Sequence, residues 1–352
     1  MAGDVVWSAQ GTTPDEIEAA LRELLNEVYA KNEDVVPARV LNMIVFVDRA
    51  WTGEIANRLR GVGRYHASRM LVFAYEPKRE SLDARVTIGS ESPAAPGEMA
   101  LLRETVVVEI GDRHLDDLVT IADPLVITDL PTLLWSPHGH PEVIEELLAL
   151  AQAILLDSVE ETDPQEALQR AGALSDDAYV VDLAWLRSTP WRERVAAGFD
   201  PPARRHELRR ITAVTVRHHP ASTAAALLLA GWLASRLEWQ TPQLLAHGAA
   251  LAGKARSSRQ DVTLSLQAAP ELRVPGLESV AIETASGRSL QLARAPGGLR
   301  ARSRDARGTE REWTVLGASR GETGVLGEGI RQTLLRDPTY VPALRAALAM
   351  AG

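Results

Sequence analysis

The sequence contains no cysteine, and this absence excludes several kinds of chemistry at once. Disulfide bonds, thiol nucleophiles, thiolate metal ligands and thiol redox switches all need cysteine side chains. The sequence also has no run of about 18 uncharged apolar residues, the length that a membrane-spanning helix needs. Its start, Met1-Ala2-Gly3-Asp4, lacks the basic and apolar segments of a secretory signal. We therefore expect a cytoplasmic protein with no membrane partner.

Positive charge is scarce in the first part of the chain. Residues 1–160 contain 13 Lys and Arg against 27 Asp and Glu, a net charge of 13 − 27 = −14. The remainder contains 25 basic and 20 acidic residues, a net charge of +5. Because a strongly acidic surface repels phosphate groups, we do not expect nucleic acid as a partner.

The length of 352 residues exceeds the range of roughly 100–200 residues that is usual for one domain. The hydrophobic fraction of 45% and the charged fraction of 24% are ordinary for a globular chain. The segment Phe199-Asp200-Pro201-Pro202-Ala203 has the composition of a linker. We therefore predict an N-terminal helical segment at 1–34, an N-terminal domain at 35–200 and a C-terminal domain at 201–352.

The hydrophobic pattern predicts an α/β fold in both domains. Short, β-branched apolar runs at 39–47 and 69–75 are typical of buried strands, and a helix at 51–59 separates them. Such a strand–helix–strand unit favours a Rossmann-like, mostly parallel sheet. In the C-terminal domain, a helix is predicted at 221–237. Strand-like alternation with Gly-containing turns at 261–315 predicts a mixed or antiparallel sheet flanked by helices.

The familiar catalytic motifs are missing from the sequence. It has no Walker A loop, no G-x-S-x-G nucleophile elbow and no H-E-x-x-H zinc motif. Gly61-x-Gly63 follows a predicted helix and lacks the third glycine of a dinucleotide fingerprint. The glycines between Gly321 and Gly329 are typical of an ordinary turn before a helix. We therefore expect no catalytic residues and no cofactor.

Two histidine and arginine groups are candidate binding sites. His138-Gly139-His140 offers two imidazoles but no third ligand at metal spacing, so we expect no metal. Arg204, Arg205 and His206 follow the linker, and guanidinium groups are well suited to clamping carboxylates or phosphates. These three residues are the candidate anion-binding site.

Tryptophan is unusually frequent, with eight residues against three phenylalanines. Trp135 and Trp191 lie near prolines at the ends of predicted elements, and Arg192 follows Trp191 directly. Exposed tryptophan beside arginine is typical of interface hot spots, so Trp135, Trp191 and Arg192 are the candidate partner-binding residues. The alternative is that each aromatic ring folds back onto its own domain. On the first interpretation, Trp191→Ala and Arg192→Ala weaken partner binding and leave the fold intact.

Several segments, taken together and in order, resemble the glucose-6-phosphate dehydrogenase assembly proteins, the OpcA family. The resemblance spans about residues 38–350, and at His66-Ala67-Ser68-Arg69 the chain departs from the family by carrying Ala67 in place of proline. The other matching segments are Ala38–Val45, Asp129–Trp135, Asp182–Trp185 with Thr189–Glu193, Ala224–Trp239 and Arg336–Tyr340.

This resemblance implies a non-enzymatic partner of glucose-6-phosphate dehydrogenase that promotes assembly or activation of that enzyme. The enzyme feeds the oxidative pentose phosphate pathway and supplies NADPH. Cyanobacterial members are controlled through cysteines, which this chain lacks. Two alternatives stay open: a sugar-phosphate hydrolase of the lactonase type, and a sugar-phosphate or nucleotide sensor with Arg204, Arg205 and His206 at its site.

Overall fold

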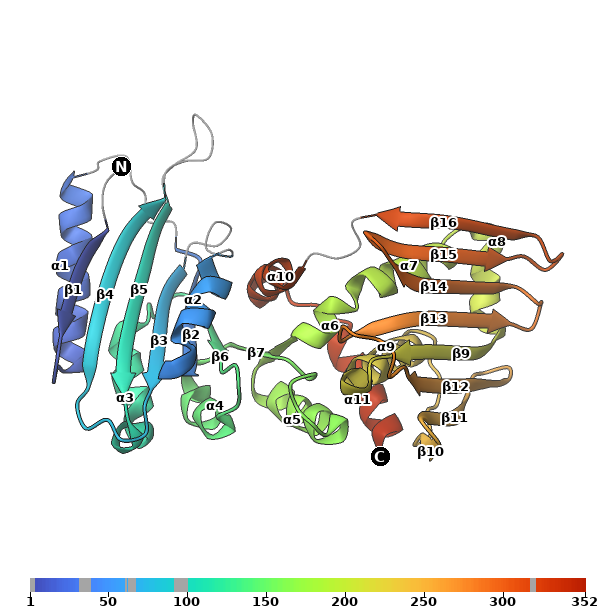
Figure 1. Cartoon of the computed structure of the whole chain (residues 1–352), viewed down its shortest axis with the longest axis horizontal. Coiled ribbons are helices and arrows are strands. Elements are labelled where there is room, and N and C mark those ends of the chain that lie inside the picture. The colour runs from blue at the N-terminus through green and yellow to red at the C-terminus, as the bar shows by residue number, and fades with distance from the viewer. Residues whose placement is uncertain (1–3, 32–38, 61, 63–67, 92–100, 317–320) are drawn as a thin grey trace. The chain divides into compact units, whose positions relative to one another are not determined.

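The chain folds into two compact units in the computed structural model, which describes residues 4–31, 39–60, 62, 68–91, 101–316 and 321–352 (Figure 1). Each unit is assembled from segments that lie far apart in the sequence. Unit 1 comprises Met1–Leu156, Asp177–Val181 and Glu322–Arg336. Unit 2 comprises Asp157–Asp176, Asp182–Gly321 and Asp337–Gly352. The predicted boundaries at 34/35 and 200/201 stay predictions.

An eight-stranded sheet forms the centre of unit 1, in the order β1-β4-β5-β3-β2-β6-β7-β8. Its strands are β1 (Val5–Ala9), β2 (Leu41–Asp48), β3 (Ser68–Tyr75), β4 (Asp83–Glu91), β5 (Leu101–Ile110), β6 (Thr132–Trp135), β7 (Ala153–Leu156) and β8 (Tyr179–Asp182). Its helices are α1 (Pro14–Lys31), α2 (Thr52–Arg60), α3 (Leu118–Ala122), α4 (Pro141–Leu147) and α10 (Gly321–Leu335).

Six neighbouring strands of this sheet have the order of a Rossmann fold. Counted from β2 in chain order, the strands from β5 to β8 run 3-2-1-4-5-6, which is the doubly wound arrangement. Strand β2 pairs in parallel with β3 and β6, and β3 pairs in parallel with β5. The prediction of a Rossmann-like, mostly parallel sheet is confirmed, with β1 and β4 added as an antiparallel edge.

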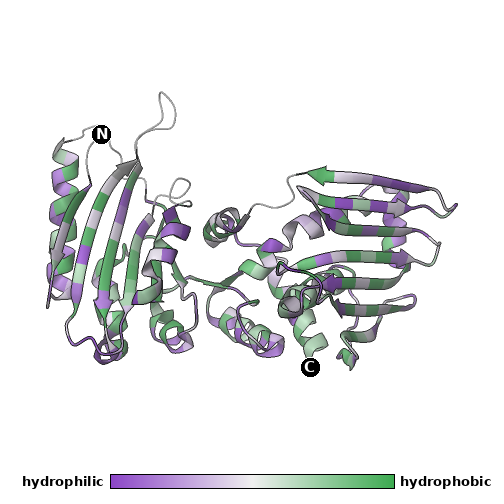
Figure 2. Cartoon of the chain, viewed as in Figure 1, coloured by the Kyte–Doolittle hydropathy of each residue, from purple (hydrophilic) through white to green (hydrophobic). Residues whose placement is uncertain are grey.

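The central strands are apolar because they are buried on both faces. All residues from Leu41 to Val47 are buried, and the apolar residues run without alternation through β2 (Figure 2). The one polar residue among them, Asn42, is fully hydrogen-bonded. Its Nδ2 donates to the Ile127 carbonyl at 2.9 Å, and its Oδ1 accepts from the Ile127 amide at 2.9 Å. Asn42 thereby fixes the loop that leads into β6.

A second eight-stranded sheet forms unit 2, in the order β10-β11-β12-β9-β13-β14-β15-β16. Its strands are β9 (Ile211–His218), β10 (Leu245–His247), β11 (Ala250–Arg256), β12 (Asp261–Ala268), β13 (Leu277–Thr284), β14 (Ser289–Ala295), β15 (Gly298–Arg304) and β16 (Glu310–Leu316). Only the β9–β12 pair is parallel among the described strand pairs of this sheet, so the predicted mixed sheet is confirmed.

Helices cover one face of the unit 2 sheet. Helix α9 packs on β9 and β12, α7 packs on β14, and α11 packs on the outer side of α9 (Figure 1). The helices of this unit are α5 (Pro164–Asp177), α6 (Leu183–Arg187), α7 (Thr189–Phe199), α8 (Pro202–Arg205), α9 (Thr223–Arg236) and α11 (Tyr340–Ala351).

The contact between α9 and α11 depends on Gly231. A Cβ atom at this position would lie 2.2 Å from the carbonyl oxygen of Ala343 and 2.9 Å from the amide nitrogen of Ala347. Both are backbone atoms, so relief requires the two helices to move apart. Gly231 therefore sets the distance between the helices.

Gly231→Ala is expected to destabilise the fold by about 1–3 kcal/mol, as overpacking of a core does. This outcome opposes intrinsic helix propensity, which favours alanine over glycine by about 1 kcal/mol. Gly327→Ala in α10 is the matched control, because its Cβ would meet only the Val62 side chain at 3.8 Å. Urea unfolding measures both variants, and equal midpoints for the two would contradict the close approach of α9 and α11.

Candidate functional site

Two segments that carry the family resemblance meet in the interior of unit 2. Trp185, on α6, donates a hydrogen bond from Nε1 to Oδ2 of Asp337 at 2.9 Å, although 152 positions separate the two residues. The Trp185 ring also packs against the ring of Tyr340, with 5.6 Å between centroids. Asp337 in turn accepts hydrogen bonds from the amide and hydroxyl of Thr339 just before α11. The start of α11 is thereby fastened to α6.

Arg192 completes this arrangement from the first turns of α7. Its guanidinium carbon lies 3.3 Å from the centroid of the Trp185 ring, a cation–π contact. One Nη donates to Thr189 at 2.8 Å, and the other lies 4.0 Å from the Asp337 carboxylate. Burial lowers the pKa of Arg192 to about 10, and the charge of Asp337 opposes this shift. The side chain is therefore still a cation at neutral pH.

Asp182 lies beneath Tyr340 and is fully buried. It accepts hydrogen bonds from the Ser158 hydroxyl at 2.6 Å, the Ala184 amide at 2.9 Å and the Tyr340 hydroxyl at 3.2 Å. The bond to Ala184 caps the N-terminus of α6. Burial, and then the charge of Asp157, raise the pKa of Asp182 to about 6.

We call Asp182, Trp185, Arg192, Asp337 and Tyr340 the Trp185 cluster. Its polar groups are directed at one another, and the contacts of Asp337 with Trp185 and of Tyr340 with Asp182 join parts of the chain that are distant in sequence. An arrangement of this kind stabilises the positions of α6, α7 and α11. The cluster is therefore a structural support of unit 2.

The second place to examine is the switch point of the unit 1 sheet, between the carboxyl ends of β2 and β6. Ligands of doubly wound folds bind at this point, and a dinucleotide pyrophosphate there needs a glycine-rich turn after the first strand. In this chain, His140 from the segment after β6 fills the position. Its Nε2 lies 3.0 Å from Oδ1 of Asp48, at the end of β2, and its ring packs edge-on against Phe46 and Tyr75.

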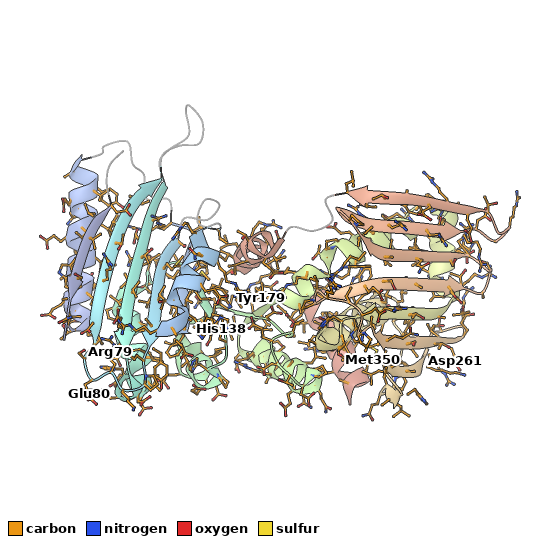
Figure 3. The ribbon with its side chains drawn as sticks, viewed as in Figure 1. Arg79, Glu80, His138, Tyr179, Asp261 and Met350 are labelled. Atoms are coloured by element: carbon orange, nitrogen blue, oxygen red, sulfur yellow. The ribbon has the colours of Figure 1, made fainter. Side chains whose placement is uncertain are left out.

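Trp51 and His138 lie next to each other close to the switch point. The ring of His138, labelled in Figure 3, lies 5.4 Å from that of Trp51, and both His138 and His140 adopt positive φ angles. The turn after β2 reads Arg49-Ala50-Trp51, without the glycines that admit a pyrophosphate. Asp48 and Glu54 add negative charge where phosphate groups would lie. These residues do not fit a dinucleotide.

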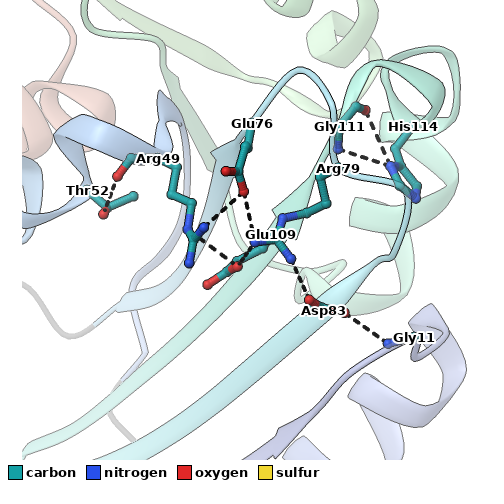
Figure 4. A network of polar contacts seen from close by, with 9 residues as sticks. All are labelled: Gly11, Arg49, Thr52, Glu76, Arg79, Asp83, Glu109, Gly111 and His114. Atoms are coloured by element: carbon teal, nitrogen blue, oxygen red, sulfur yellow. Dashed lines mark hydrogen bonds and ion pairs between the residues drawn. The ribbon is translucent and has the colours of Figure 1, made fainter.

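Arginines near this edge of the sheet are engaged with carboxylates. Arg49 Nη1 lies 2.9 Å from Glu76 Oε2, and Arg79 contacts Glu76, Asp83 and Glu109 (Figure 4). Among the residues that the structure describes, no group of three or more His, Asp or Glu side chains could hold a metal ion. His140 contacts one carboxylate with each ring nitrogen, the second being Glu142 at 3.2 Å.

The residues predicted to bind a partner are buried. Trp135 lies within the central strand β6 and is 3% exposed, Trp191 is 6% exposed and Arg192 is 7% exposed. The expectation that they are surface residues is wrong, because Trp191 faces the core and Arg192 stacks on Trp185. The alternative interpretation, rings folded back onto their own unit, describes their placement. Whether they contribute to partner binding stays a prediction.

The predicted anion-binding residues lie together at the end of α8. Arg205 donates to the Asp200 carbonyl at 2.8 Å, Arg204 donates to the Gly198 carbonyl at 3.4 Å, and His206 lies 3.0 Å from the Glu207 carboxylate. Each contact is made within the same short segment. Anion binding at this site stays a prediction.

The central members of the Trp185 cluster were not assigned a role from sequence. Asp182, Asp337 and Tyr340 occur in the segments that carry the family resemblance, and this was the available signal. In unit 1, a segment that carries the family resemblance also makes a buried structural contact. Arg69, from the segment with the unusual Ala67, pairs with the buried Glu104 at 2.8 Å.

Comparisons with known proteins agree with this architecture. Residues 60–173 match the family described as the glucose-6-phosphate dehydrogenase subunit N-terminal domain, and residues 178–344 match the C-terminal domain of the same subunit. The structure resembles that of glucose-6-phosphate 1-dehydrogenase from Mycobacterium avium. The TM-score is 0.55 at 9% identity, and the likeness covers 89% of this chain and 91% of that chain.

Two curated relatives are both named "Putative OxPP cycle protein OpcA". The protein from Synechococcus elongatus is 30% identical over 141 residues, which is 39% of this chain and 32% of that protein. The protein from Nostoc punctiforme is 38% identical over 120 residues, 33% of this chain and 26% of that protein. The matches thus span about a third of the relatives' length or less.

The fold defines a two-unit α/β protein, with a doubly wound unit and a second unit built on a large mixed sheet. The two family matches together cover most of the chain. The chain belongs to the OpcA family of glucose-6-phosphate dehydrogenase assembly proteins.

Trp191→Ala is expected to destabilise unit 2 by about 3–5 kcal/mol, the usual cost of truncating a buried tryptophan. Trp51→Ala is the matched control, because Trp51 is 47% exposed, and it is expected to cost less than about 1 kcal/mol. Thermal unfolding of the two variants measures the difference. A wild-type melting temperature for Trp191→Ala would contradict the burial of Trp191.

Asp182→Asn is expected to change how stability depends on pH. The folded-state pKa of about 6 exceeds the unfolded value of about 3.9, so the contribution of Asp182 is largest below pH 4 and is lost as pH rises through 6. The loss amounts to about 3 kcal/mol. Burial lowers the pKa of His218, so His218 makes the folded state more stable as pH rises. The quantity to compare is therefore the difference in unfolding free energy between the wild-type chain and Asp182→Asn at each pH.

Urea unfolding at pH 4.5 and pH 7.5 measures this difference. We expect Asp182→Asn to be destabilised relative to the wild-type chain at pH 4.5 and to recover much of this deficit at pH 7.5. Asp15→Asn, at an exposed aspartate, is the matched control. If Asp182→Asn lowers the free energy of unfolding by the same amount at both pH values, the raised pKa of Asp182 is contradicted.

Proposed function

We propose that this chain is a non-catalytic partner that binds glucose-6-phosphate dehydrogenase and favours its active oligomer. The observation that carries the proposal is a doubly wound fold that lacks the glycine-rich turn after its first strand and pairs His140 with Asp48 at its switch point. His140, Asp48 and Trp51 lie where this fold receives a dinucleotide. Family membership supports the identity of the partner, because both matching family descriptions name that enzyme.

The proposed mechanism is a shift of population. A protein that binds the active form of an enzyme more tightly than the inactive form increases the share of the active form. A tenfold differential in affinity corresponds to about 1.4 kcal/mol, which a few contacts supply. No chemical step by this chain is required.

The alternatives receive less support from the structure. The sugar-phosphate or nucleotide sensor was expected to use Arg204, Arg205 and His206. These side chains contact two backbone carbonyls and one carboxylate of their own segment. No described contact joins these three side chains to a polar group from another part of the chain. The assembly function is therefore the one that the geometry supports best.

The test mixes the purified chain with glucose-6-phosphate dehydrogenase of the same organism. We expect NADPH production to rise, by up to about tenfold at saturation, and a larger complex to elute in size-exclusion chromatography with light scattering. The chain alone is expected to produce no NADPH from glucose 6-phosphate, and its melting temperature is expected not to rise with NADP+. Unchanged activity and unchanged mass in the mixture would overturn the proposal.

A further inference from the structure

The two faces of the unit 2 sheet differ in what covers them. In every strand from β9 to β15 except β10 and β11, buried and accessible residues alternate. The buried residues face α7 and α9, and an example is the series Val262, Leu264 and Leu266 of β12. The residues on the opposite face of these strands are half-buried or exposed. We call this second side the open face.

Small, uncharged side chains occupy the middle of the open face. The strand registers place one row of residues across the sheet, from β11 to β16: Ala252, Ser265, Thr215, Ala281, Gln291, Arg302 and Glu312. The central members, Ser265, Thr215 and Ala281, are half-buried. Alanine is depleted in strands, and a solvent-exposed sheet face usually carries longer polar side chains. The small residues in this row are therefore unusual.

Charged residues lie around this row, including Arg217 on β9 and Glu283 on β13, each two positions from its centre. One side carries Lys254, Arg256 and Asp261, the last of which is labelled in Figure 3. The other side carries Arg300, Arg302 and Arg304 on β15, with Glu310 and Glu312 opposite them on β16. A centre with little charge and a charged rim is the anatomy of a protein interface.

The open face is large enough for a stable complex. Eight strands spaced about 4.8 Å apart, each with about seven residues rising 3.3 Å, span an area of about 900 Å². A standard protein interface buries about 800 Å² on each partner. One flat partner surface could therefore be accommodated without any contribution from unit 1.

We propose that the open face docks a β-sheet of a glucose-6-phosphate dehydrogenase subunit, face to face. This inference rests on the proposed function, which names the partner. Two sheets pack face to face at about 10 Å, and small side chains in the centre permit this approach. The partner must present a comparable sheet. The fold likeness to the Mycobacterium avium enzyme, over 91% of that chain, makes this enzyme a suitable occupant.

A second copy of the chain fits the face less well. The sheet is centred between β9 and β13, so a two-fold axis along the strands would place β15 on β11. Arg304 would then meet Lys254, because the strand registers place these two residues in one row. A two-fold axis across the strands would place β15 on itself. Both arrangements bring like charges together, which costs affinity.

Ala281→Arg tests the proposal by placing a long cation at the centre of the open face. In the free chain the new side chain can extend into solvent, so the melting temperature is expected to stay within a few degrees of wild type. The matched control is Ala19→Arg, because Ala19 is exposed on α1 in unit 1. Gln291→Arg, at an exposed position of the same row, is the second variant should Ala281→Arg fold poorly.

The measurement is the dissociation constant for the dehydrogenase, by titration with light scattering on the same samples. We expect at least a tenfold increase for Ala281→Arg and Gln291→Arg, and no change for Ala19→Arg. Wild-type affinity in both open-face variants overturns the docking site and leaves the proposed function standing. A wild-type chain that does not bind overturns the proposed function itself. A wild-type homodimer that Ala281→Arg dissociates overturns the choice of partner.

Discussion

The stack of Arg192 on Trp185, tied to Asp337, is the interaction on which the organisation of unit 2 depends. It joins α6, α7 and the turn before α11 in one buried cluster. Helix α11 packs on α9, and α9 covers one face of the sheet. A buried charged pair contributes little net stability compared with an apolar replacement. Removing one partner, however, leaves the other as an unpaired buried charge, which is destabilising. The cluster therefore specifies the position of α11 more than it strengthens the core.

The strand order of unit 1 and the residues at its switch point bear directly on the proposed function. Unit 1 has the strand order that creates a ligand site in doubly wound folds, and it places His140 and Asp48 at that point, with Trp51 beside His138. Unit 2 has a broad sheet with one face of half-buried and exposed residues. Because fold and function are separable, this architecture by itself assigns no activity.

Much of the architecture was predictable from sequence. The unbroken apolar runs predicted β2 and β3 because central parallel strands are buried on both faces. The alternation in 261–315 predicted the mixed or antiparallel sheet, because strands with one buried face alternate between apolar and polar residues. The strands β10 and β11 were not predicted, because their mostly accessible residues show no clean alternation. Helices α6 and α7 were not separated from sequence, because Ser188 between them has an αR backbone conformation.

The candidate site was harder to predict. A proline beside Trp191 marks the end of an element but does not give the direction of the ring, and the ring points inward. The bond between Trp185 and Asp337 joins residues 152 positions apart, which no local pattern records. The position of the His140 ring depends on positive φ angles at His138 and His140. Histidine is enriched in this conformation, but most histidines do not adopt it, so the sequence does not locate it.

The most direct test of the central claim is native mass spectrometry of an equimolar mixture of this chain and glucose-6-phosphate dehydrogenase. The account predicts species that are heavier than the dehydrogenase oligomer by whole multiples of the mass of this chain. It also predicts that the oligomer of the enzyme in these species is the active one. A spectrum with only the separate proteins, at concentrations where activity is measured, would contradict the account.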